Sequence, residues 1–201
     1  MPLKTKIVLS DKELTLIKND DWILTKQVII AKIYDMLNQC IEIIDDHMPF
    51  KTGVGTDFPT QPPKIYKGEN YLGLPYITLD HPRLFNNEDI FAIRTMFWWG
   101  NFFSITLHVA GYYKKKFAKK IIGNYVSIPA EVFICIHKEQ WHHHFNPGNF
   151  IKVPDFSFQQ AVVLLEERDF IKLSIKFDLD QFNKMQELLI DGYKKILNII
   201  A

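Results

Sequence analysis

Cysteine is scarce in this chain, which has two in 201 residues. Cys40 falls on an apolar helical pattern and Cys135 in an apolar strand-like run, and neither belongs to a C-x-x-C pair. Such scarcity argues against a fold held together by disulfides. We expect two free, buried thiols and a protein of the reducing cytoplasm.

The sequence also lacks an excess of charge of one sign and any long apolar run. Lysine and arginine number 24 against 23 aspartates and glutamates, a formal net charge of +1. Because the chain is nearly neutral, its overall charge does not favour binding to nucleic acid or to an anionic membrane. No stretch approaches the roughly 18 apolar residues of a spanning helix, and the first residues lack the apolar run of a signal peptide. We expect a soluble cytoplasmic protein without a membrane partner.

Aromatic residues, in contrast, are plentiful: 16 phenylalanines, 8 tyrosines and 4 tryptophans. Aromatic side chains bury more area than aliphatic ones and are enriched in strands. This excess indicates a thick sheet-based core, an aromatic-walled cavity, or both.

Several segments have helical patterns. Ser10 and Glu13 have the spacing of a capping box, which predicts a short helix over 11–18. Apolar residues at three- and four-residue spacing predict long helices over 22–46 and through the C-terminal 178–200. Shorter helices are predicted within 86–96, 112–123 and 156–169.

Residues 46–63 contain four prolines and two glycines and predict a long loop of the kind that forms lids or binding loops. Without internal repeats or a composition break, the chain is expected to form a single domain, 1–201. Residues 74–80, 102–109, 131–137 and 170–177 alternate in the manner of strands. Helices at both ends with strands between them predict an α+β fold: a mainly antiparallel sheet with the long N- and C-terminal helices packed on one face.

Alternate positions of these four runs divide into two faces. One set, such as Ile77, Leu79 and Ile105, is almost entirely apolar and should form the core. The other mixes hydroxyls, aromatics, histidines and charges. We interpret it as a semi-polar binding face, although loops or a second copy of the chain could equally cover it. Its candidate ligand-binding residues are Tyr76, Thr106, His108, Phe133 and His137.

The run RTMFWWGNFF, residues 94–103, adds Arg94 and Trp98 to these candidates. Adjacent Trp98 and Trp99 must point to opposite faces of a strand. One would enter the core, and the other could give a planar ligand or a partner a flat platform beside Arg94. Alternatively, both indoles are buried under loops.

Three consecutive histidines precede the NPGN turn at 146–149. If residues 140–145 are extended, His142 and His144 lie on one side, about 7 Å apart, and could share a metal ion. A third ligand would have to be His137, His108 or another side chain from elsewhere. Alternatively, Trp141 and Phe145 anchor the segment in the core and the histidines are ordinary exposed residues.

Ser104, Thr106 and His108 do not predict nucleophilic catalysis, because same-face neighbours in a strand lie too far apart for a direct hydrogen bond and no G-x-S-x-G elbow is present.

Five lysines within 112–120 are typical of a solvated helix face, though such a patch could meet phosphates.

Together these patterns predict non-catalytic binding of a small molecule or protein partner on the semi-polar face. The alternatives are a metal-dependent enzyme using the histidine cluster and nucleic-acid binding through the lysine-rich helix, for which no recognition motif is present. A homo-oligomer is compatible with these patterns, and no cofactor is indicated.

Overall fold

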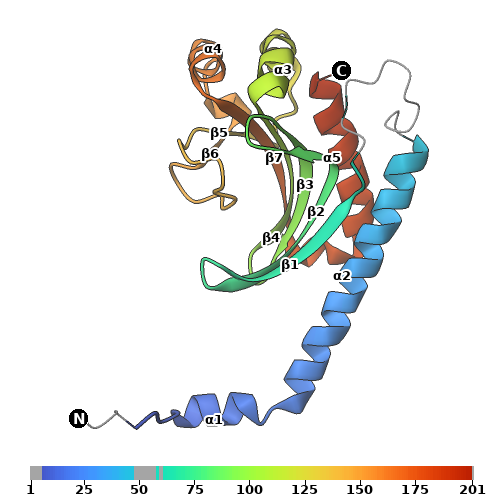
Figure 1. Ribbon diagram of the computed structural model, residues 1–201, viewed down its shortest axis with the longest axis vertical. Coiled ribbons are helices and arrows are strands. Elements are labelled where there is room, and N and C mark those ends of the chain that lie inside the picture. Colours follow the sequence, from blue (N-terminus) through green and yellow to red (C-terminus); the bar gives the residue numbers. More distant parts are fainter. Residues whose placement is uncertain (1–5, 48–57, 59–60, 201) are drawn as a thin grey trace. The chain divides into compact units, whose positions relative to one another are not determined.

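The computed structural model describes residues 6–47, 58 and 61–200. This part of the chain has an α+β architecture with five α-helices and one seven-stranded antiparallel sheet (Figure 1). The predicted fold class is confirmed. The chain divides into two compact units, residues 1–36 and 37–201. The helices are α1 (Asp11–Ile17), α2 (Asp20–His47), α3 (Gly111–Gly123), α4 (Phe158–Glu167) and α5 (Met185–Ile200).

The sheet lies wholly in the second unit, with strand order β1-β2-β3-β4-β7-β5-β6. The first four strands follow one another as a meander, and β7 returns to pair with both β4 and β5. The strands are β1 (Lys64–Tyr71), β2 (Leu74–Phe85), β3 (Ile90–Trp98), β4 (Phe102–Ala110), β5 (Val132–Cys135), β6 (Phe150–Lys152) and β7 (Phe170–Asp178).

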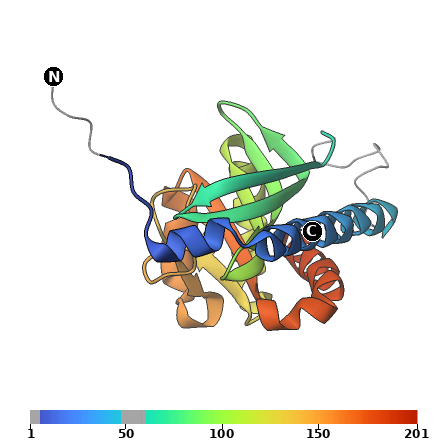
Figure 2. The ribbon, with the colours of Figure 1, turned by 90° about the horizontal axis from the view of Figure 1, so that it is seen from below.

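The apolar face predicted from alternation is the core face. Leu79, Ile105 and Leu173 are fully buried there. Helix α5 lies along this face (Figures 1 and 2), and Gly192 permits the close approach, since a Cβ at that position would lie 2.8 Å from Cδ1 of Ile105. Tyr193 beside it accepts a hydrogen bond from the Thr95 hydroxyl (3.1 Å). The C-terminal helix therefore packs on the sheet as expected.

The part of α2 that belongs to the second unit, residues 37–47, is also attached to this unit. Leu37, Cys40 and Ile44 are buried at three- and four-residue spacing, and the Gln186 side chain donates to Gln39 (3.0 Å). Burial raises the pKa of the Cys40 thiol to about 12 and also raises that of Cys135. Both cysteines are free and buried, as predicted.

Most of the helices predicted from the sequence are present in the structure. The capping box of Ser10 and Glu13 is present at α1. The helix expected from residue 86 was wrong, because the Asn86 side chain accepts hydrogen bonds from the backbone N–H groups of Glu88 and Asp89, a turn after which β3 begins at Ile90. An asparagine followed by acidic residues is a signal shared by helix starts and such turns.

Most of the predicted 46–63 loop lies outside the described residues. Its described end is joined to the sheet: Gln61 forms an isolated bridge with Arg83, whose Nε donates to the Pro62 carbonyl (2.8 Å). Strand β1 follows immediately and was not among the predicted strands.

Candidate functional site

The sheet face opposite α5 carries polar side chains in one transverse row. Asp80 (β2), Arg94 (β3), Thr106 (β4), Ser174 (β7) and Phe133 (β5) are successive Cα partners across five neighbouring strands. Antiparallel partners point to the same side of a sheet. We call this surface, together with its neighbours His108 and Lys172, the polar strand face.

An ion pair occupies one end of the row. The Arg94 guanidinium binds Asp80 through two parallel hydrogen bonds, Nε to Oδ1 at 2.7 Å and one terminal nitrogen to Oδ2 at 2.8 Å. Both side chains are largely buried, 10% and 18% exposed for Asp80 and Arg94. Burying either charge alone would be costly, so each holds the other in place.

The hydroxyls in the middle of the row are satisfied within the sheet. Thr106 and Ser174 are hydrogen bonded to each other (2.8 Å), and Ser174 also donates to the Ile105 carbonyl (3.1 Å). Neither hydroxyl contacts a histidine through any of these bonds. Both hydroxyls are therefore engaged in hydrogen bonds within the sheet.

The polar strand face is covered by residues 136–149, the connection between β5 and β6, which we call the cover segment. His108, Thr106 and Ser174 are each no more than 6% exposed. The sequence left open whether this face is an open binding surface or is covered by loops or a second copy of the chain. These three residues are covered by a loop of the chain itself. Asn149 is fully buried at the end of the segment, where its backbone carbonyl accepts from Ile136 N–H (2.9 Å) and its amide donates to the His144 carbonyl.

Lys172 attaches the cover segment to the sheet. This β7 lysine is 1% exposed, and its ammonium donates to the backbone carbonyls of Gln140 (3.0 Å) and His142. Desolvation lowers the pKa of Lys172 to about 8. A buried ammonium needs such acceptors, so the two carbonyls and the lysine stabilise one another.

His108 is the second attachment. Its Nε2 lies 3.0 Å from the Gln140 side-chain oxygen, and its ring meets the Trp141 ring edge to face at 5.4 Å. Because an amide oxygen only accepts, Nε2 carries the proton. Burial, together with the positive charge of Lys172, lowers the pKa of His108 to about 3. The imidazole is therefore neutral at physiological pH.

His143 joins the segment to the ion pair and to β1. Arg94 lies 3.3 Å from its Nε2 and, being only a donor, requires a neutral acceptor there. Burial and the charges of Lys172 and Arg94 hold the pKa of His143 well below its usual value. The backbone N–H groups of His143 and His144 donate to the Tyr71 hydroxyl at 2.6 and 3.1 Å.

Aromatic packing completes the coverage. Phe145 contacts Phe102 and Phe133 edge to face, both at 5.0 Å between ring centroids. Trp98 lies on this face, as predicted for one of the paired tryptophans, but it is 6% exposed and donates its indole N–H to the Tyr71 carbonyl (3.2 Å). It is not an open platform.

The structure thus brings most of the predicted ligand-binding residues together. Tyr76, Arg94, Trp98, Thr106, His108 and Phe133 share one side of the sheet, with Tyr76 beside Tyr71 at 6.1 Å. His137 lies just beyond β5, in the cover segment, where its Nδ1 accepts from Glu139 N–H (3.0 Å).

The three-histidine prediction is only partly matched. The ring of His142 lies 4.4 Å from that of His137 and 5.3 Å from that of His144, in a tilted stack. Residues 140–145 are not a strand, and within the described part of the chain no group of three His, Cys, Asp or Glu side chains is placed to hold a metal ion. A metal site at His142 and His144 stays a prediction. Desolvation and the neighbouring imidazoles lower the pKa of His144.

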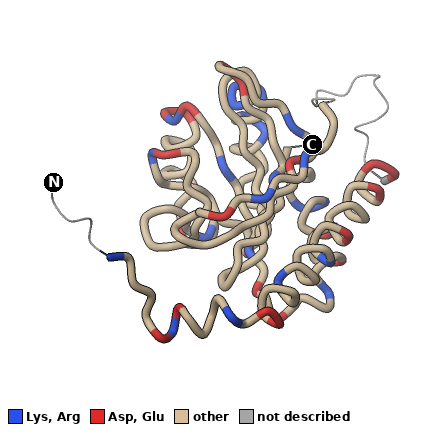
Figure 3. The backbone as a smooth tube through the Cα atoms, turned by 60° about the horizontal axis from the view of Figure 1, so that its bottom comes forward, with Lys and Arg blue, Asp and Glu red and all other residues tan. Residues whose placement is uncertain are grey.

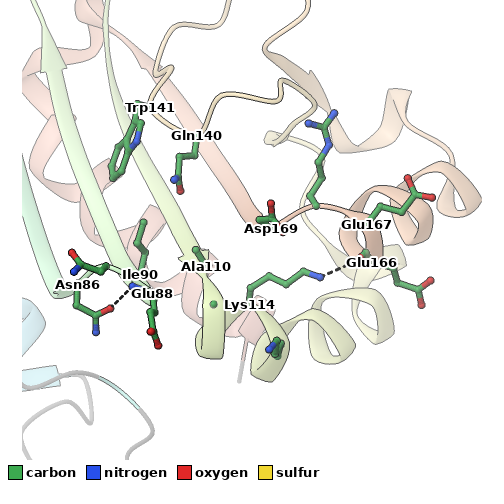
Figure 4. A pocket seen from close by; sticks show the side chains of 14 residues that line it. Asn86, Glu88, Ile90, Ala110, Lys114, Gln140, Trp141, Glu166, Glu167 and Asp169 are labelled. Atoms are coloured by element: carbon green, nitrogen blue, oxygen red, sulfur yellow. Dashed lines mark hydrogen bonds between the residues drawn. The ribbon is translucent and has the colours of Figure 1, made fainter.

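A cavity of about 520 Å³ opens where the cover segment meets α3 and α4 (Figure 4). Trp141 and Gln140 lie on one side, with Ile90, Glu88 and Lys114 across from them. The cavity is lined by Asn86, Asn87, Glu88, Ile90, Ala110, Gly111, Lys114, Lys115, Gln140, Trp141, Glu166, Glu167, Arg168 and Asp169.

The walls of this cavity are set by backbone turns. Gly111, at the junction of β4 and α3, has a φ of +58°, and a Cβ there would come 2.2 Å from the Glu88 carbonyl oxygen. Asp89 accepts from Tyr112 N–H (2.7 Å) at the first turn of α3. Lys114 donates to the Glu166 carbonyl (3.0 Å), which links α3 to α4.

The lining is mixed in charge. Its three basic residues, Lys114, Lys115 and Arg168, face four acidic ones, and the side chains of Glu166 and Glu167 extend away from Trp141 (Figure 4). The Trp141 side is aromatic, because the indole is 48% exposed and backed by His108 and Phe85. One of the two alternatives for this segment placed Trp141 in the core as an anchor, and for Trp141 that alternative was wrong, because its ring lies at the surface of the cavity.

The sequence analysis did not identify Gln140 and Lys172, which attach the cover segment to the polar strand face. Lys172 carried a signal, since a lysine at the centre of a strand, on the same parity as Ser174, faces the interior of a covered sheet. Gln140 carried none, because its contribution is a side-chain oxygen on His108 and a backbone carbonyl on Lys172.

Comparison with known proteins shows no family for this chain. No family model and no curated protein matches it. A conserved hypothetical protein from Pyrococcus furiosus is similar over 83% of this chain and 97% of its own, with 10% identity and a TM-score of 0.32.

Two further expectations concern the helices. None of the described helices has both the length and the apolar content to cross a bilayer. On α3, Phe117 and Ile121 are buried, and the ammonium of Lys116 lies over the Tyr112 ring at 5.6 Å. This helix has the amphipathic form expected for it, and nucleic-acid binding through its lysines stays a prediction.

Proposed function

We propose that the protein binds a small planar heterocycle, without catalysis, in the cavity bounded by Trp141 and Gln140. The observation that carries this proposal is the position of Trp141. Its indole is the large aromatic surface that borders the cavity, half exposed, while the ring is fixed from behind by His108 at 5.4 Å. A flat, fixed, solvent-facing indole is a stacking platform.

The remaining lining favours a ligand without strong net charge. Basic and acidic residues nearly balance, so neither an anion nor a cation is selected by the overall field. Side-chain amides of Asn86, Asn87 and Gln140 supply donors and acceptors, and the Gln140 amide nitrogen stays available when its oxygen serves His108. These amide groups match heterocycles that carry both hydrogen-bond donors and acceptors, as nucleobases do.

The size of the cavity supports the same class. Small-molecule sites commonly have about 300–1,000 Å³, and about 520 Å³ accommodates a bicyclic ring with a sugar-sized substituent. Ile90 and Ala110 give the floor an apolar surface that would cover one side of such a ring.

A thermal-shift and calorimetric series tests the proposal. Adenosine and uridine serve as planar probes, and ribose alone is the matched compound without a ring. We expect a nucleoside to raise the melting temperature, since a ligand of the native state stabilises it, and ribose to have no effect. No shift with any planar heterocycle, or an equal shift with ribose, would overturn the proposal.

Trp141→Ala supplies the residue-level test. Loss of stacking should weaken nucleoside binding about 5- to 150-fold, because base–aromatic stacking is worth roughly 1–3 kcal/mol. Phe158→Ala is the matched control, since Phe158 is similarly exposed (44%) and lies outside the cavity. Equal affinities of the two variants would contradict a site at Trp141.

A further inference from the structure

Positive charge is concentrated on helix α3 (Gly111–Gly123). Basic and acidic residues are interspersed along most of the backbone (Figure 3), but none of the residues between Asp89 and Glu131 is acidic. Within this stretch α3 contains five lysines, Lys114, Lys115, Lys116, Lys119 and Lys120. The helix is therefore a local cationic surface in a nearly neutral chain.

Three of these lysines share one face of α3 with a tyrosine. Tyr112, Lys115, Lys116 and Lys119 follow one another at the spacing i, i+3, i+4 and i+7, on the side of the helix opposite its buried residues. Lys115 and Lys119 are exposed and lie one turn apart, about 6 Å along the helix axis. The Tyr112 side chain is 57% exposed. We call these four residues the lysine stripe.

The lysine stripe is unfavourable for the helix that carries it. Lys114 closes the first turn of α3, and Lys115 and Lys116 follow directly, near the end at which the helix dipole disfavours cations. The first turn contains no acidic residue. Lys115 and Lys119 are also like charges four residues apart, a spacing that destabilises helices. Such local conflicts are expected at functional sites, and a bound anion would offset both effects.

The lysine stripe begins at the edge of the cavity bounded by Trp141. Gly111, Lys114 and Lys115 line this cavity, and Lys114 lies across it from Trp141 (Figure 4). A ligand that extends from Trp141 across the cavity therefore reaches the first turns of α3. Its far end meets Lys115, which belongs both to the cavity lining and to the lysine stripe.

The acidic residues of the cavity lining determine where an anionic group can bind. They are Glu88, Glu166, Glu167 and Asp169. Lys114 is directed toward this side, since its ammonium donates to the Glu166 carbonyl (3.0 Å). The cavity thus suits the uncharged part of a ligand, and the lysine stripe suits an anionic part.

We propose that the ligand of the cavity is a nucleoside diphosphate or triphosphate whose phosphates bind Lys115, Lys116 and Lys119 on the lysine stripe. This inference rests on the proposed function, since it places the base on Trp141. Lysine ammonium groups are common phosphate ligands, and lysines one turn apart can contact linked phosphates. The nearly neutral chain attracts a long polyanion weakly, which favours a free nucleotide over a nucleic-acid strand.

Calorimetric titration of the full chain without divalent cations tests the proposal with adenosine, ADP and inorganic tripolyphosphate as probes. We expect ADP to bind about tenfold more tightly than adenosine, because charge-assisted hydrogen bonds to phosphate add to the contacts of the base. Raising sodium chloride from about 50 to about 500 mM should weaken the binding of ADP and leave that of adenosine unchanged, since salt screens only the charged contacts.

Lys116→Gln with Lys119→Gln tests the lysines themselves. Neither residue lines the cavity, so the double variant should lose about tenfold in ADP affinity and keep the affinity for adenosine. Its melting temperature should not fall, because the substitutions remove like charges from α3. Lys184→Gln with Lys194→Gln is the matched control, since these lysines are also exposed and lie outside the cavity and α3. It should bind ADP as the wild type does.

The outcomes separate this inference from the proposed function. Equal affinities for ADP and adenosine, or equal ADP affinities of the two double variants, would overturn the phosphate site and leave the nucleoside site standing. Lysine-dependent binding of tripolyphosphate without binding of adenosine would overturn the proposed function and support the phosphate site. An oligoadenylate strand that binds more tightly than ADP would contradict a free nucleotide and assign the lysine stripe to nucleic acid.

Discussion

Replacing Arg94 by methionine should lower the free energy of unfolding by about 3–5 kcal/mol, because it leaves the Asp80 carboxylate buried without its partner. The pair has two hydrogen bonds, at 2.7 and 2.8 Å, and Asp80 is only 10% exposed. Chemical denaturation with urea measures the effect. Loss of the 3.3 Å contact between Arg94 and His143 should also increase amide hydrogen exchange in the cover segment.

The control for this prediction is Lys195→Met. Lys195 also contacts carboxylates, Glu131 at 2.6 Å and Asp191 at 2.7 Å, but all three side chains are at least 36% exposed. Solvent screening limits exposed pairs to about 1 kcal/mol or less. If Arg94→Met were as mild as Lys195→Met, the buried ion pair would not be a structural determinant of the polar strand face.

Acidification from pH 7 to pH 5 should destabilise the protein by about 2 kcal/mol through His108 alone. The folded pKa of His108 is about 3 against 6.5 unfolded, so the unfolded chain binds the proton first. Stability is therefore full above the unfolded pKa and is lost as pH falls through it. His143 acts in the same direction, since its folded pKa is also depressed.

Urea unfolding at several pH values checks this prediction. His108→Gln should flatten the pH dependence between 7 and 5, whereas His137→Gln, a half-buried histidine of the cover segment, should leave the His108 contribution intact. A wild-type stability that is constant or rises over this interval would show that His108 is not held neutral beneath the cover segment.

The faces of the sheet could be predicted because alternation has a fixed period in strands. Leu79, Ile105 and Leu173 were assigned to the core, and Thr106 and His108 to the opposite face, from parity alone, and both assignments are confirmed. The helix expected after Asn86 failed because its sequence signal is shared by a turn. The local sequence is compatible with both a helix start and a turn. The pairing of β3 with β2 and β4 determines that a turn and a strand form there.

The cover segment could not be predicted for a different reason. Many of its attachments use backbone groups, such as the carbonyls bound by Lys172 and the N–H groups bound by the Tyr71 hydroxyl. Every residue has these groups, so they leave no pattern in the sequence. The cavity could not be predicted either, because its walls come from segments that are distant in the chain, from Asn86 to Asp169.

The most direct test of the account is where a planar ligand contacts the protein. The four tryptophans give separate indole N–H signals in a proton–nitrogen correlation spectrum, with Trp141→Phe identifying the one at the cavity. On titration with adenosine or uridine, we predict a large, saturable shift of the Trp141 signal while that of Trp22, equally exposed at 48%, stays in place. A saturable shift confined to another tryptophan, or no shift at all, would contradict the assignment of the binding site.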